Sequence, residues 1–433
     1  MDTKTIAQVT NGLQGEIAIP GDKSISHRSV MFSALGSTPV HITNFLHAQD
    51  CLSTAACMEK LGAKVEFLSD TELIVTGNGL NGLKEAQSII DAGNSGTTLR
   101  LMMGILAPQP FLTTFTGDAS LHKRPMGRII KPLAKMGATI YGRQENTKLP
   151  ITIVPTGKKL QGMCYESPVA SAQVKSAILL AGMYAEGDTT VVEPFTSRDH
   201  TERMLAAFGV KTKKEGTAVT ISPVKEFKAP ASIEVPGDIS SAAYWLVAGA
   251  LIPDSKLLLK NVGINETRTG IIDVLEAMGA KLTIKNKRLS GGEEAADIEV
   301  AASKLHGTSF GAEIMPRLID EIPIIAVAAL LADGDTVITG AGELRVKETD
   351  RLQAITDQFN KFAPGAIEGT EDGLIIHGGQ TINKATAFSY DDHRIAMSLA
   401  ILGAAGSGAV IENSACVNIS YPAFYQTLEE LRK

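Results

Sequence analysis

The stretch IAIPGDKSISHRSVMFSALG (17–36) passes from a strand-like run through Pro-Gly-Asp into an apolar, helix-like segment. The same frame returns as IEVPGDISSAAYWLVAGALI (233–252) in the second half of the chain. Three basic residues of the first copy, Lys23, His27 and Arg28, are replaced by uncharged residues in the second. The repeated turn predicts a duplicated structure. The basic residues predict a ligand-binding role for the first copy, and we expect the second to serve as scaffold or hinge.

A second repeat consists of a helix-like run that ends in glycine and is followed by a small residue and a strand-like run. Glycine suits the position just past a helix, because it adopts the left-handed backbone at little cost. These positions predict outer helices that end at a glycine and lead directly into a strand. The copies are MEKLGAKVEF (58–67), PLAKMGATIY (132–141), MLAAFGVKTK (204–213) and VLEAMGAKLT (274–283), with Gly62, Gly137, Gly209 and Gly279 as their glycines.

Between these runs lie six segments rich in Ala and Leu, each of which leads into a strand-like run. Because the segments are apolar on nearly every face, we expect interior helices surrounded by sheet. The two repeats together predict units of strand, buried helix, strand, outer helix and two strands. Three units in each half give two similar α/β domains. We place these domains at residues 20–236 and at residues 1–19 plus 237–433, with a hinge near both crossings.

The composition is typical of a soluble globular protein, since 44% of the 433 residues are hydrophobic and 20% are charged. A net charge of −6 argues against a nucleic-acid partner, so any anion site must be formed by local cations. The longest apolar run (322–332) is too short to span a bilayer, and the N-terminal residues show no secretory signal. Four cysteines without metal-binding spacing predict a reducing, cytoplasmic environment.

Residues typical of helix caps precede each apolar helix. A helix N-terminus exposes free N–H groups and a partial positive charge, and it therefore favours anions. If three such ends converge in each domain, the facing domains surround an anion-selective cleft. The polar segments that precede the helices are PGDKSISHR (20–28), DAGNSGTTLR (91–100), SPVASAQVK (167–175), VPGDISS (235–241), RLIDEIP (317–323) and SYDDHR (389–394).

Basic residues at these helix starts are the first candidates for ligand binding. Lys23 and Arg28 lie at the unfavourable end of a helix dipole, so they indicate a bound phosphate or carboxylate rather than a solvated cap. The turn at 91–100 and the basic run at 122–126 bind an anion on one interpretation and are an ordinary cap and surface charge on the other. The same two interpretations apply to the residues Ser171, Gln173, Lys175 and Arg198.

Acidic residues form a second group of candidates. Asp320 and Glu321 stand together before a very apolar helix, and capping accounts for one acid but not for two. Asp320 is therefore our candidate general base. The segment ELRVKETDRL (343–352) alternates in charge and either forms helical salt bridges or serves the site. His393 and Arg394 again indicate an anion at a helix start.

The motifs PGDKSISHR, GNSGTTLR, KRPM, SAQVKSA, RVKETDRL and DDHRIAM occur in this order between residues 20 and 397. The chain in this respect resembles the 5-enolpyruvylshikimate-3-phosphate synthase family, and most closely its bacterial, glyphosate-tolerant class II type. The resemblance implies a two-domain enolpyruvyl transferase fold. In that fold each domain holds three βαβαββ units with buried parallel helices, in an inverse α/β barrel-like arrangement.

The resemblance also implies the reaction. The family transfers the enolpyruvyl group of phosphoenolpyruvate to the 5-hydroxyl of shikimate 3-phosphate and releases phosphate, in the shikimate pathway of aromatic amino-acid biosynthesis. It uses no organic cofactor and no metal. We expect small-molecule substrates, no nucleic acid, no membrane and a monomer.

Site residues follow from matching motifs. The implied catalytic residues are Asp320 as base, Glu348 as acid and Lys23 as an assisting group. Shikimate 3-phosphate is implied to contact Lys23, Ser24, Arg28, Ser171, Ala172, Gln173, Arg198, Asp320 and Lys347. Phosphoenolpyruvate is implied to contact Lys23, Gly96, Arg124, Gln173, Arg351 and Arg394.

Two positions bear on how far the resemblance extends. Some family members have a lysine where this chain has Ile419 and Ser420, so one phosphate contact is absent or supplied elsewhere. Gly96 matches the family, which leaves sensitivity to the inhibitor glyphosate open.

Two other functions share part of this pattern. A UDP-N-acetylglucosamine enolpyruvyl transferase usually carries a loop cysteine, but GDASLHKRP (117–125) has none. A non-catalytic binder of phosphorylated metabolites would need the basic helix starts without both Asp320 and Glu348.

Overall fold

The computed structural model describes residues 2–432, and within them the chain divides into two compact units. The N-terminal unit comprises Gly21–Pro236 together with the short segment Leu289–Glu293. The C-terminal unit comprises the chain up to Pro20, Gly237–Arg288 and the chain from Glu294 onward. Each unit has its own hydrophobic core, so each is described by itself.

In the N-terminal unit the sheets have the strand orders β14-β3-β5-β4, β6-β7-β9-β8 and β10-β11-β13-β12. In each sheet the first pair is parallel and the remaining pairs are antiparallel. The strands are β3 (Val40–Thr43), β4 (Lys64–Ser69), β5 (Glu72–Thr76), β6 (Ile90–Asp91), β7 (Thr113–Thr116), β8 (Thr139–Gly142), β9 (Lys148–Val154), β10 (Cys164–Glu166), β11 (Thr189–Val192), β12 (Thr212–Glu215), β13 (Ala218–Ile221) and β14 (Ser232–Glu234).

The C-terminal unit repeats this order in β2-β15-β17-β16 and β18-β19-β21-β20. Its remaining described sheet is β1-β23-β22, in which the strand at the start of the chain pairs antiparallel with β23. The strands are β1 (Thr3–Ile6), β2 (Gln14–Ala18), β15 (Lys256–Gly263), β16 (Lys281–Ser290), β17 (Glu293–Ala301), β18 (Ser309–Phe310), β19 (Thr336–Ile338), β20 (Ile367–Gly369), β21 (Leu374–Ile376), β22 (Ala385–Phe388) and β23 (Ala409–Glu412).

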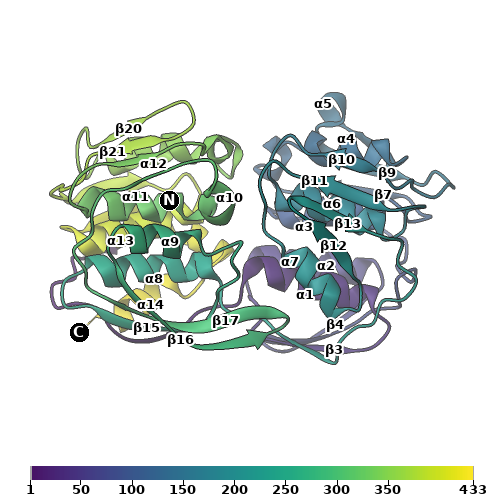
Figure 1. Ribbon diagram of the computed structural model, residues 1–433, viewed down its shortest axis with the longest axis horizontal. Helices are drawn as coiled ribbons and strands as arrows, with labels where there is room; N and C mark the ends of the chain where they lie inside the picture. The colour runs from purple at the N-terminus through teal and green to yellow at the C-terminus, as the bar shows by residue number, and fades with distance from the viewer. Residues whose placement is uncertain (1, 433) are drawn as a thin grey trace. The chain divides into compact units, whose positions relative to one another are not determined.

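The apolar segments form helices that lie inside each unit, as predicted (Figure 1). In α8, for example, every residue from Ile239 to Ala250 is buried. The interior helices of the N-terminal unit are α1 (Lys23–Leu35), α3 (Gly96–Leu106) and α6 (Ala172–Gly182). Those of the C-terminal unit are α8 (Ile239–Leu251), α11 (Ile322–Leu331) and α13 (His393–Ala405). The predicted order of strand, buried helix, strand, outer helix and two strands is thereby confirmed in five of the six units. In the sixth, no described strand follows α14 (Phe424–Glu430), and β1 from the start of the chain pairs with β23 instead.

Outer helices cover the units and end where the glycine repeat predicted. Gly62, Gly137, Gly209 and Gly279 have φ angles of 95°, 101°, 79° and 91°, which is the left-handed region. The outer helices are α2 (Gln49–Lys60), α4 (Gly127–Lys135), α7 (His200–Ala207), α9 (Gly270–Ala277), α12 (Arg351–Phe359) and α14 (Phe424–Glu430).

The two Pro-Gly-Asp turns join strands and helices of different units. Strand β2 precedes α1 in sequence but pairs with β15 of the C-terminal unit, while β14 precedes α8 but pairs with β3 of the N-terminal unit. Glycine is needed at the turn because the backbone passes very close to a neighbour. A Cβ at Gly21 would lie 1.9 Å from the carbonyl oxygen of Asn44, and one at Gly237 would lie 2.8 Å from that of Asn261.

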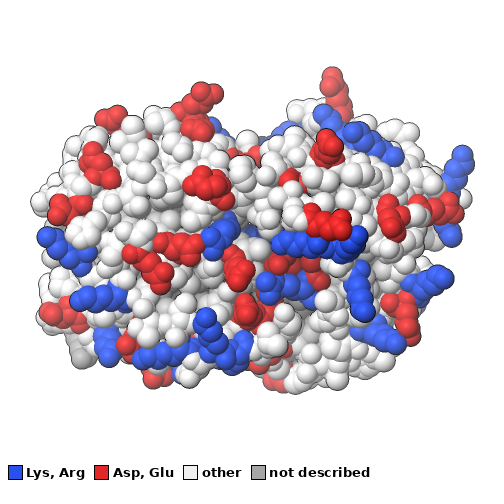
Figure 2. Space-filling view, viewed as in Figure 1, with Lys and Arg blue, Asp and Glu red and all other residues white. Residues whose placement is uncertain are grey.

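The surface carries charges of both signs. On the face that Figure 2 shows, basic and acidic side chains alternate over each unit. This distribution agrees with the expectation that local cations, rather than a general positive field, form any anion site. No helix within residues 2–432 is both long and apolar enough to cross a membrane.

Candidate active site

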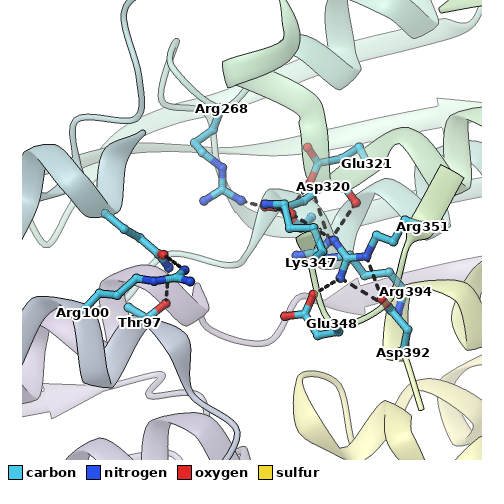
Figure 3. Close-up of polar contacts among 12 residues, drawn as sticks. Thr97, Arg100, Arg268, Asp320, Glu321, Lys347, Glu348, Arg351, Asp392 and Arg394 are labelled. Carbon is cyan, nitrogen blue, oxygen red and sulfur yellow. Dashed lines mark hydrogen bonds and ion pairs between the residues drawn. The ribbon is translucent and has the colours of Figure 1, made fainter. Parts of the chain in front are cut away.

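Arg351 is the centre of the polar cluster in the C-terminal unit (Figure 3). It is the first residue of α12, whose start is capped by the side chain of Asp350, and it is only 1% exposed. Its guanidinium donates from Nε to Asp392 Oδ2 at 2.8 Å, from Nη2 to Glu348 Oε2 at 2.7 Å and from Nη1 to Asp320 Oδ1 at 3.2 Å. One arginine therefore fixes three carboxylates from three separate segments.

The charge of this cluster is set by those pairings. Burial alone lowers the pKa of Arg351, but Asp392, Glu348 and Asp320 outweigh burial and hold the pKa above its usual value. Lys347 adds a second cation, with its Nζ 3.4 Å from Asp320 Oδ1. The predicted base Asp320 and the predicted acid Glu348 thus share Arg351, and their protonation states are coupled.

Arg394 lies in the first turn of α13 and faces the same carboxylate segment. Asp392 caps this helix by accepting from the Arg394 main-chain N–H at 2.9 Å. Arg394 Nη1 donates to the main-chain oxygen of Asp320 at 3.3 Å and lies 3.8 Å from Glu321 Oε1. Burial lowers the pKa of Arg394, but Asp320 and other anionic neighbours raise it above its usual value overall. The guanidinium is therefore a permanent cation at a helix start.

Neither acid of the Asp320–Glu321 pair caps α11, since no side chain caps that helix. Asp320 turns toward Lys347 and Arg351, whereas Glu321 is 1% exposed and accepts a short hydrogen bond from Ser240 Oγ. The expectation that capping explains one of the two acids is wrong, because both carboxylates are held by other side chains.

The second Pro-Gly-Asp turn acquires a cation from elsewhere in the chain. Arg268, in the turn before α9, donates from Nη2 to Ser240 Oγ at 2.8 Å and to Asp238 Oδ1 at 3.3 Å. It is 3% exposed, so it belongs to the interior of the unit. The second copy of the frame has no basic residues of its own, but the fold places Arg268 beside it. The residues of the frame alone do not predict this contact.

Three helix starts meet in the C-terminal unit as a result. Ser240 of α8 bonds Glu321 at the start of α11, and Arg394 of α13 lies beside Glu321. The expected convergence is therefore observed inside this unit.

In the N-terminal unit, Lys23 opens α1 and forms an ion pair with Asp50 in the first turn of α2. Asp22 caps α1 by accepting from the Ile25 N–H at 2.9 Å. Beside them His27 is fully buried, and burial followed by the charges of Lys23 and Arg28 lowers its pKa well below the usual value. His27 is therefore neutral, and the cationic character of the turn comes from Lys23 and Arg28.

Arg28 links three helices at their N-terminal ends. It donates from Nε to Thr201 Oγ1 at 2.8 Å, from Nη2 to Ser176 Oγ at 3.1 Å and from Nη1 to the Ser24 carbonyl at 3.0 Å. Burial, and to a smaller extent the charge of Arg198, outweigh acidic neighbours such as Glu202 and lower the pKa of Arg28 to about 10. The predicted ligands Arg28 and Arg198 therefore lie near enough for their like charges to interact.

A second group of predicted residues lies around the start of α3. Gln173 of α6 donates from Nε2 to Thr97 Oγ1 at 3.0 Å and accepts from Arg100 Nη1. A Cβ at Gly96 would lie 3.0 Å from Arg124 Cζ, so the absence of a side chain lets the guanidinium approach the helix start. Gly96, Arg124 and Gln173 thus lie together around the start of α3.

The start of α6 places Ser171 and Ala172. Ser171 caps the helix by accepting from the Val174 N–H, and Ala172 is its first residue. Lys175 was an open candidate for ligand binding, but it is 1% exposed and lies between Glu193 and Glu202 at 3.3 and 2.8 Å. Lys175 therefore binds acidic side chains inside the unit and is not exposed, as a cation that binds a ligand would be.

Sequence reasoning did not assign roles to Asp50, Arg100, Glu193 and Arg268. The first three contact Lys23, Gln173 and the Ser171 N–H, and Arg268 contacts Asp238 of the second turn. Arg100 stands in the motif GNSGTTLR. The other three stand in segments without a distinctive local pattern. Within residues 2–432 no group of three or more His, Cys, Asp and Glu side chains could hold a metal ion.

Comparisons with known proteins bear on this site as a whole. Residues 7–428 match the family EPSP synthase (3-phosphoshikimate 1-carboxyvinyltransferase). The chain is 52% identical over 434 aligned positions to a 3-phosphoshikimate 1-carboxyvinyltransferase of Bacillus thuringiensis subsp. konkukian and to one of Bacillus cereus, with 100% of both chains covered in each case.

Solved structures agree with the fold. A structure of EPSP synthase from Acinetobacter baumannii has a TM-score of 0.88 at 42% identity, covering 100% of this chain and 98% of the other. The enolpyruvyl transferase NikO from Streptomyces tendae has a TM-score of 0.77 at 17% identity, covering 99% of this chain and 97% of the other, and this likeness concerns the fold alone. The predicted two-domain enolpyruvyl transferase fold is confirmed.

The family match extends over nearly the whole chain, and the Bacillus relatives are 52% identical to the chain over its full length. It confirms the predicted enzyme class and favours it over the UDP-N-acetylglucosamine enzyme and over a non-catalytic binder. By the fold, the clustered carboxylates and arginines, and these relatives, the chain belongs to the EPSP synthase family of 3-phosphoshikimate 1-carboxyvinyltransferases.

Proposed function

We propose that this chain transfers the enolpyruvyl group of phosphoenolpyruvate to the 5-hydroxyl of shikimate 3-phosphate, giving 5-enolpyruvylshikimate 3-phosphate and phosphate. The observation that carries the proposal is the Arg351 cluster. A base, an acid and a permanent cation are held by direct contacts at 3.2 and 2.7 Å in one unit. A reaction that moves a proton from a hydroxyl and another to carbon needs this combination.

The proposed substrate ligands come from both units. The N-terminal unit provides the hydroxyl and basic groups at the starts of α1, α3 and α6, and the C-terminal unit provides those around Asp320 and α13. For shikimate 3-phosphate these are Lys23, Ser24, Arg28, Ser171, Ala172, Gln173, Arg198, Asp320 and Lys347. For phosphoenolpyruvate they are Lys23, Gly96, Arg124, Gln173, Arg351 and Arg394. Arginine suits both substrates because its planar fork binds phosphate and carboxylate oxygens in pairs.

The proposed chemistry begins with proton removal from the 5-hydroxyl by Asp320. Ion pairs with Lys347 and Arg351 favour the ionised form of Asp320, which is the form that accepts a proton. The oxygen then bonds to C2 of phosphoenolpyruvate while its methylene carbon receives a proton, and a tetrahedral intermediate forms. Loss of phosphate and return of the methyl proton complete the transfer.

Glu348 is the proposed proton donor to the methylene carbon. In the structure it accepts from Arg351, which favours its ionised form. A bound anion against Arg351 and Arg394 reverses that preference, because it neutralises the cations and raises the proton affinity of Glu348. Substrate binding in this proposal prepares the acid, and Lys23 assists from the N-terminal unit.

The two PGD turns are the proposed hinge between substrate domains at residues 20–236 and at residues 1–19 plus 237–433. Support comes from the strand exchange, in which each turn carries the chain from a strand of one unit into a helix of the other.

We further propose that the chain is of the class II, glyphosate-tolerant type, acts as a monomer in the cytoplasm and uses no cofactor. Support for the subtype comes from the segment SRDHTE (197–202), whose residues Thr201 and Glu202 contact Arg28 and Lys175. Gly96 leaves room beside Arg124, so the glyphosate concentration that inhibits the purified enzyme is the test of the subtype.

The deciding experiment measures phosphate release from phosphoenolpyruvate with each acceptor in turn. We expect release that depends on shikimate 3-phosphate and does not respond to UDP-N-acetylglucosamine. Release with the second acceptor but not the first would overturn the proposed reaction, and binding of shikimate 3-phosphate without any release would favour a non-catalytic binder.

A further inference from the structure

Glu193 is a buried carboxylate that directly follows β11 and is 4% exposed. Three hydrogen bonds converge on it. Its Oε1 accepts from the Ser171 main-chain N–H at 2.9 Å, and its Oε2 accepts from the Ser197 hydroxyl at 2.7 Å and from the Ser197 N–H at 3.3 Å. One side chain thereby joins the start of α6 to the segment 193–199.

Lys175 fixes this carboxylate from the other side. It is 1% exposed, and its Nζ lies 3.3 Å from Glu193 Oε2 and 2.8 Å from Glu202 Oε1 and donates to the Ser197 carbonyl at 3.3 Å. Burial lowers the pKa of Lys175, but Glu202 and Glu193 outweigh it and hold the pKa above the usual value. Lys175 is therefore charged, and it holds one oxygen of Glu193, one oxygen of Glu202 and the Ser197 carbonyl in place.

A cluster of this kind is an unusual way to stabilise a protein interior. Taking ions out of water costs much of what their attraction returns, so apolar side chains of similar volume would serve stability equally well. What an ionic cluster adds is geometry, because each bond has a required direction and length. The residues that the cluster holds in place therefore indicate what the cluster does.

Those groups adjoin proposed ligands of the phosphorylated substrate. The N–H that Glu193 binds belongs to Ser171, and Ser197 is the residue before Arg198. Arg28 approaches the same place, since its guanidinium bonds Thr201, next to Glu202 in α7. The cluster lies behind these residues, and its own charged atoms are too deeply buried to reach a substrate.

We propose that Glu193, held by Lys175, is a positioning residue that sets the start of α6 and the Arg198 segment at the distance that the phosphate group of shikimate 3-phosphate requires. The inference rests on the proposed function, because it concerns how that substrate is bound. Of the proposed phosphoenolpyruvate ligands, only Gln173 lies at the start of α6, whereas shikimate 3-phosphate has Ser171, Ala172, Gln173 and Arg198 in the two segments that Glu193 joins. Loss of Glu193 is therefore expected to weaken the binding of shikimate 3-phosphate more than that of phosphoenolpyruvate.

The test is Glu193→Gln in the full chain. The amide keeps the volume but replaces one acceptor oxygen with an NH2 group, which faces a serine donor and leaves Lys175 with one anion fewer. Loss of a hydrogen bond to a charged group weakens binding by about tenfold. We expect the KM for shikimate 3-phosphate and its Kd by calorimetry to rise by about tenfold, with kcat and the KM for phosphoenolpyruvate changed by less than about twofold.

Two variants serve as controls. Glu202→Gln removes the same charge from Lys175 but none of the serine bonds, so its effect on the KM for shikimate 3-phosphate should be clearly smaller. Glu186→Gln changes an exposed glutamate that pairs with Lys159 at 4.0 Å and should change neither KM. If Glu193→Gln fails to fold, Ser197→Ala removes only the 2.7 Å hydroxyl bond and should raise the KM for shikimate 3-phosphate by about threefold.

The outcomes separate this inference from the proposed function. Equal changes in both KM values, or a change in kcat alone, would overturn the positioning role, as would a Glu202→Gln effect as large as that of Glu193→Gln. A wild-type chain that binds shikimate 3-phosphate but does not turn it over would refute the proposed function, while the calorimetric comparison would still test Glu193. A wild-type chain that does not bind it would refute both.

Discussion

The main-chain N–H of Asp22 donates to the carbonyl of Pro236 at 2.7 Å, and this bond has a counterpart in which the N–H of Asp238 donates to Pro20 at 2.9 Å. Asp22 caps the buried helix α1 and Asp238 caps the buried helix α8, while Pro20 follows strand β2 and Pro236 follows strand β14. The two copies of the frame therefore complete one another. This reciprocity explains why the turn is duplicated although only one copy keeps its basic residues.

The glycine of the first turn should be essential for stability. In Gly21→Ala the new Cβ would meet the Asn44 carbonyl at 1.9 Å, so the backbone must shift, and we expect a loss of about 3 kcal/mol in the free energy of unfolding. Urea denaturation measures this loss in the free energy of unfolding. Gly342→Ala, where the nearest atom is 3.7 Å away, is the control and should change stability by less than about 0.5 kcal/mol. Equal stability of the two variants would contradict the close approach.

Loss of the proposed base should stop turnover without abolishing substrate binding. We expect Asp320→Asn to lower kcat by about 1,000-fold, because the amide cannot accept the hydroxyl proton. Binding of shikimate 3-phosphate, measured by calorimetry, should remain largely intact. The control Asp333→Asn changes an exposed residue that pairs with Lys304 at 3.8 Å. Near wild-type turnover in Asp320→Asn would show that another group takes the proton.

Replacement of the shared arginine should test the geometry of the cluster. Arg351→Lys keeps the charge but cannot bond Asp392, Glu348 and Asp320 together, so we expect kcat to fall by about 100-fold. Steady-state kinetics measure this. Arg345→Lys is a matched control, because Arg345 also binds an acid, Asp350, at 2.8 Å but is 35% exposed. A similar loss in both variants would mean that general stability, rather than the planar fork of Arg351, is what matters.

The space beside Arg124 should govern how tightly phosphoenolpyruvate, the smaller substrate, binds. In Gly96→Ala the Cβ would lie 3.0 Å from Arg124 Cζ, and the flexible guanidinium must move away from the helix start. We expect the KM for phosphoenolpyruvate to rise by about fivefold and glyphosate inhibition to weaken, with little change in melting temperature. Gly96→Ser should enlarge the effect. A changed KM for shikimate 3-phosphate instead would place Gly96 near the other substrate.

Asp297 should make stability depend on pH in the acid range. Burial raises its pKa, but the Asn261 N–H, Asn286 and Lys260 outweigh burial and hold the pKa well below its usual value. A carboxyl with a lowered folded pKa contributes stability that is present above the unfolded pKa of about 3.9 and is lost as the pH falls toward the folded value. The stability difference between the wild type and Asp297→Asn should therefore shrink below about pH 4.

Chemical denaturation at several pH values measures that difference. Glu215→Gln, at an exposed pair with Lys213, should show a small difference that varies little with pH. A difference between wild type and Asp297→Asn that stays constant down to pH 2 would show that the hydrogen bonds, and not the charge, carry the contribution of Asp297.

Much of the fold and of the site was predictable from local patterns. The apolar helix that contains Trp245, the left-handed Gly62 and the cap residue Asp22 each follow from a few adjacent residues, because burial periodicity and backbone conformation are local properties. The family motifs then identified the acids and arginines that the fold brings together. The motifs RVKETDRL and RLIDEIP predict Arg351 and Asp320 as site residues, and the structure shows that the two are in contact.

The rest depended on residues far apart in the sequence. Lys175 looked like a cation at a helix start, but the fold turns it inward between Glu193 and Glu202. Arg268 was unremarkable in sequence, yet it supplies the cation that the second PGD frame lacks. No local pattern specifies such partners, since a charged side chain takes its role from whichever groups the tertiary structure places beside it.

Composition and spacing along the chain define the repeating α/β units, the buried helices and the family. Folding in three dimensions settles which strand completes which sheet, brings three carboxylates to Arg351 and places a cation beside the polar turn of the second frame. The physical reason is that hydrogen bonds and ion pairs act over about 3 Å in space, whatever the separation of their residues along the chain.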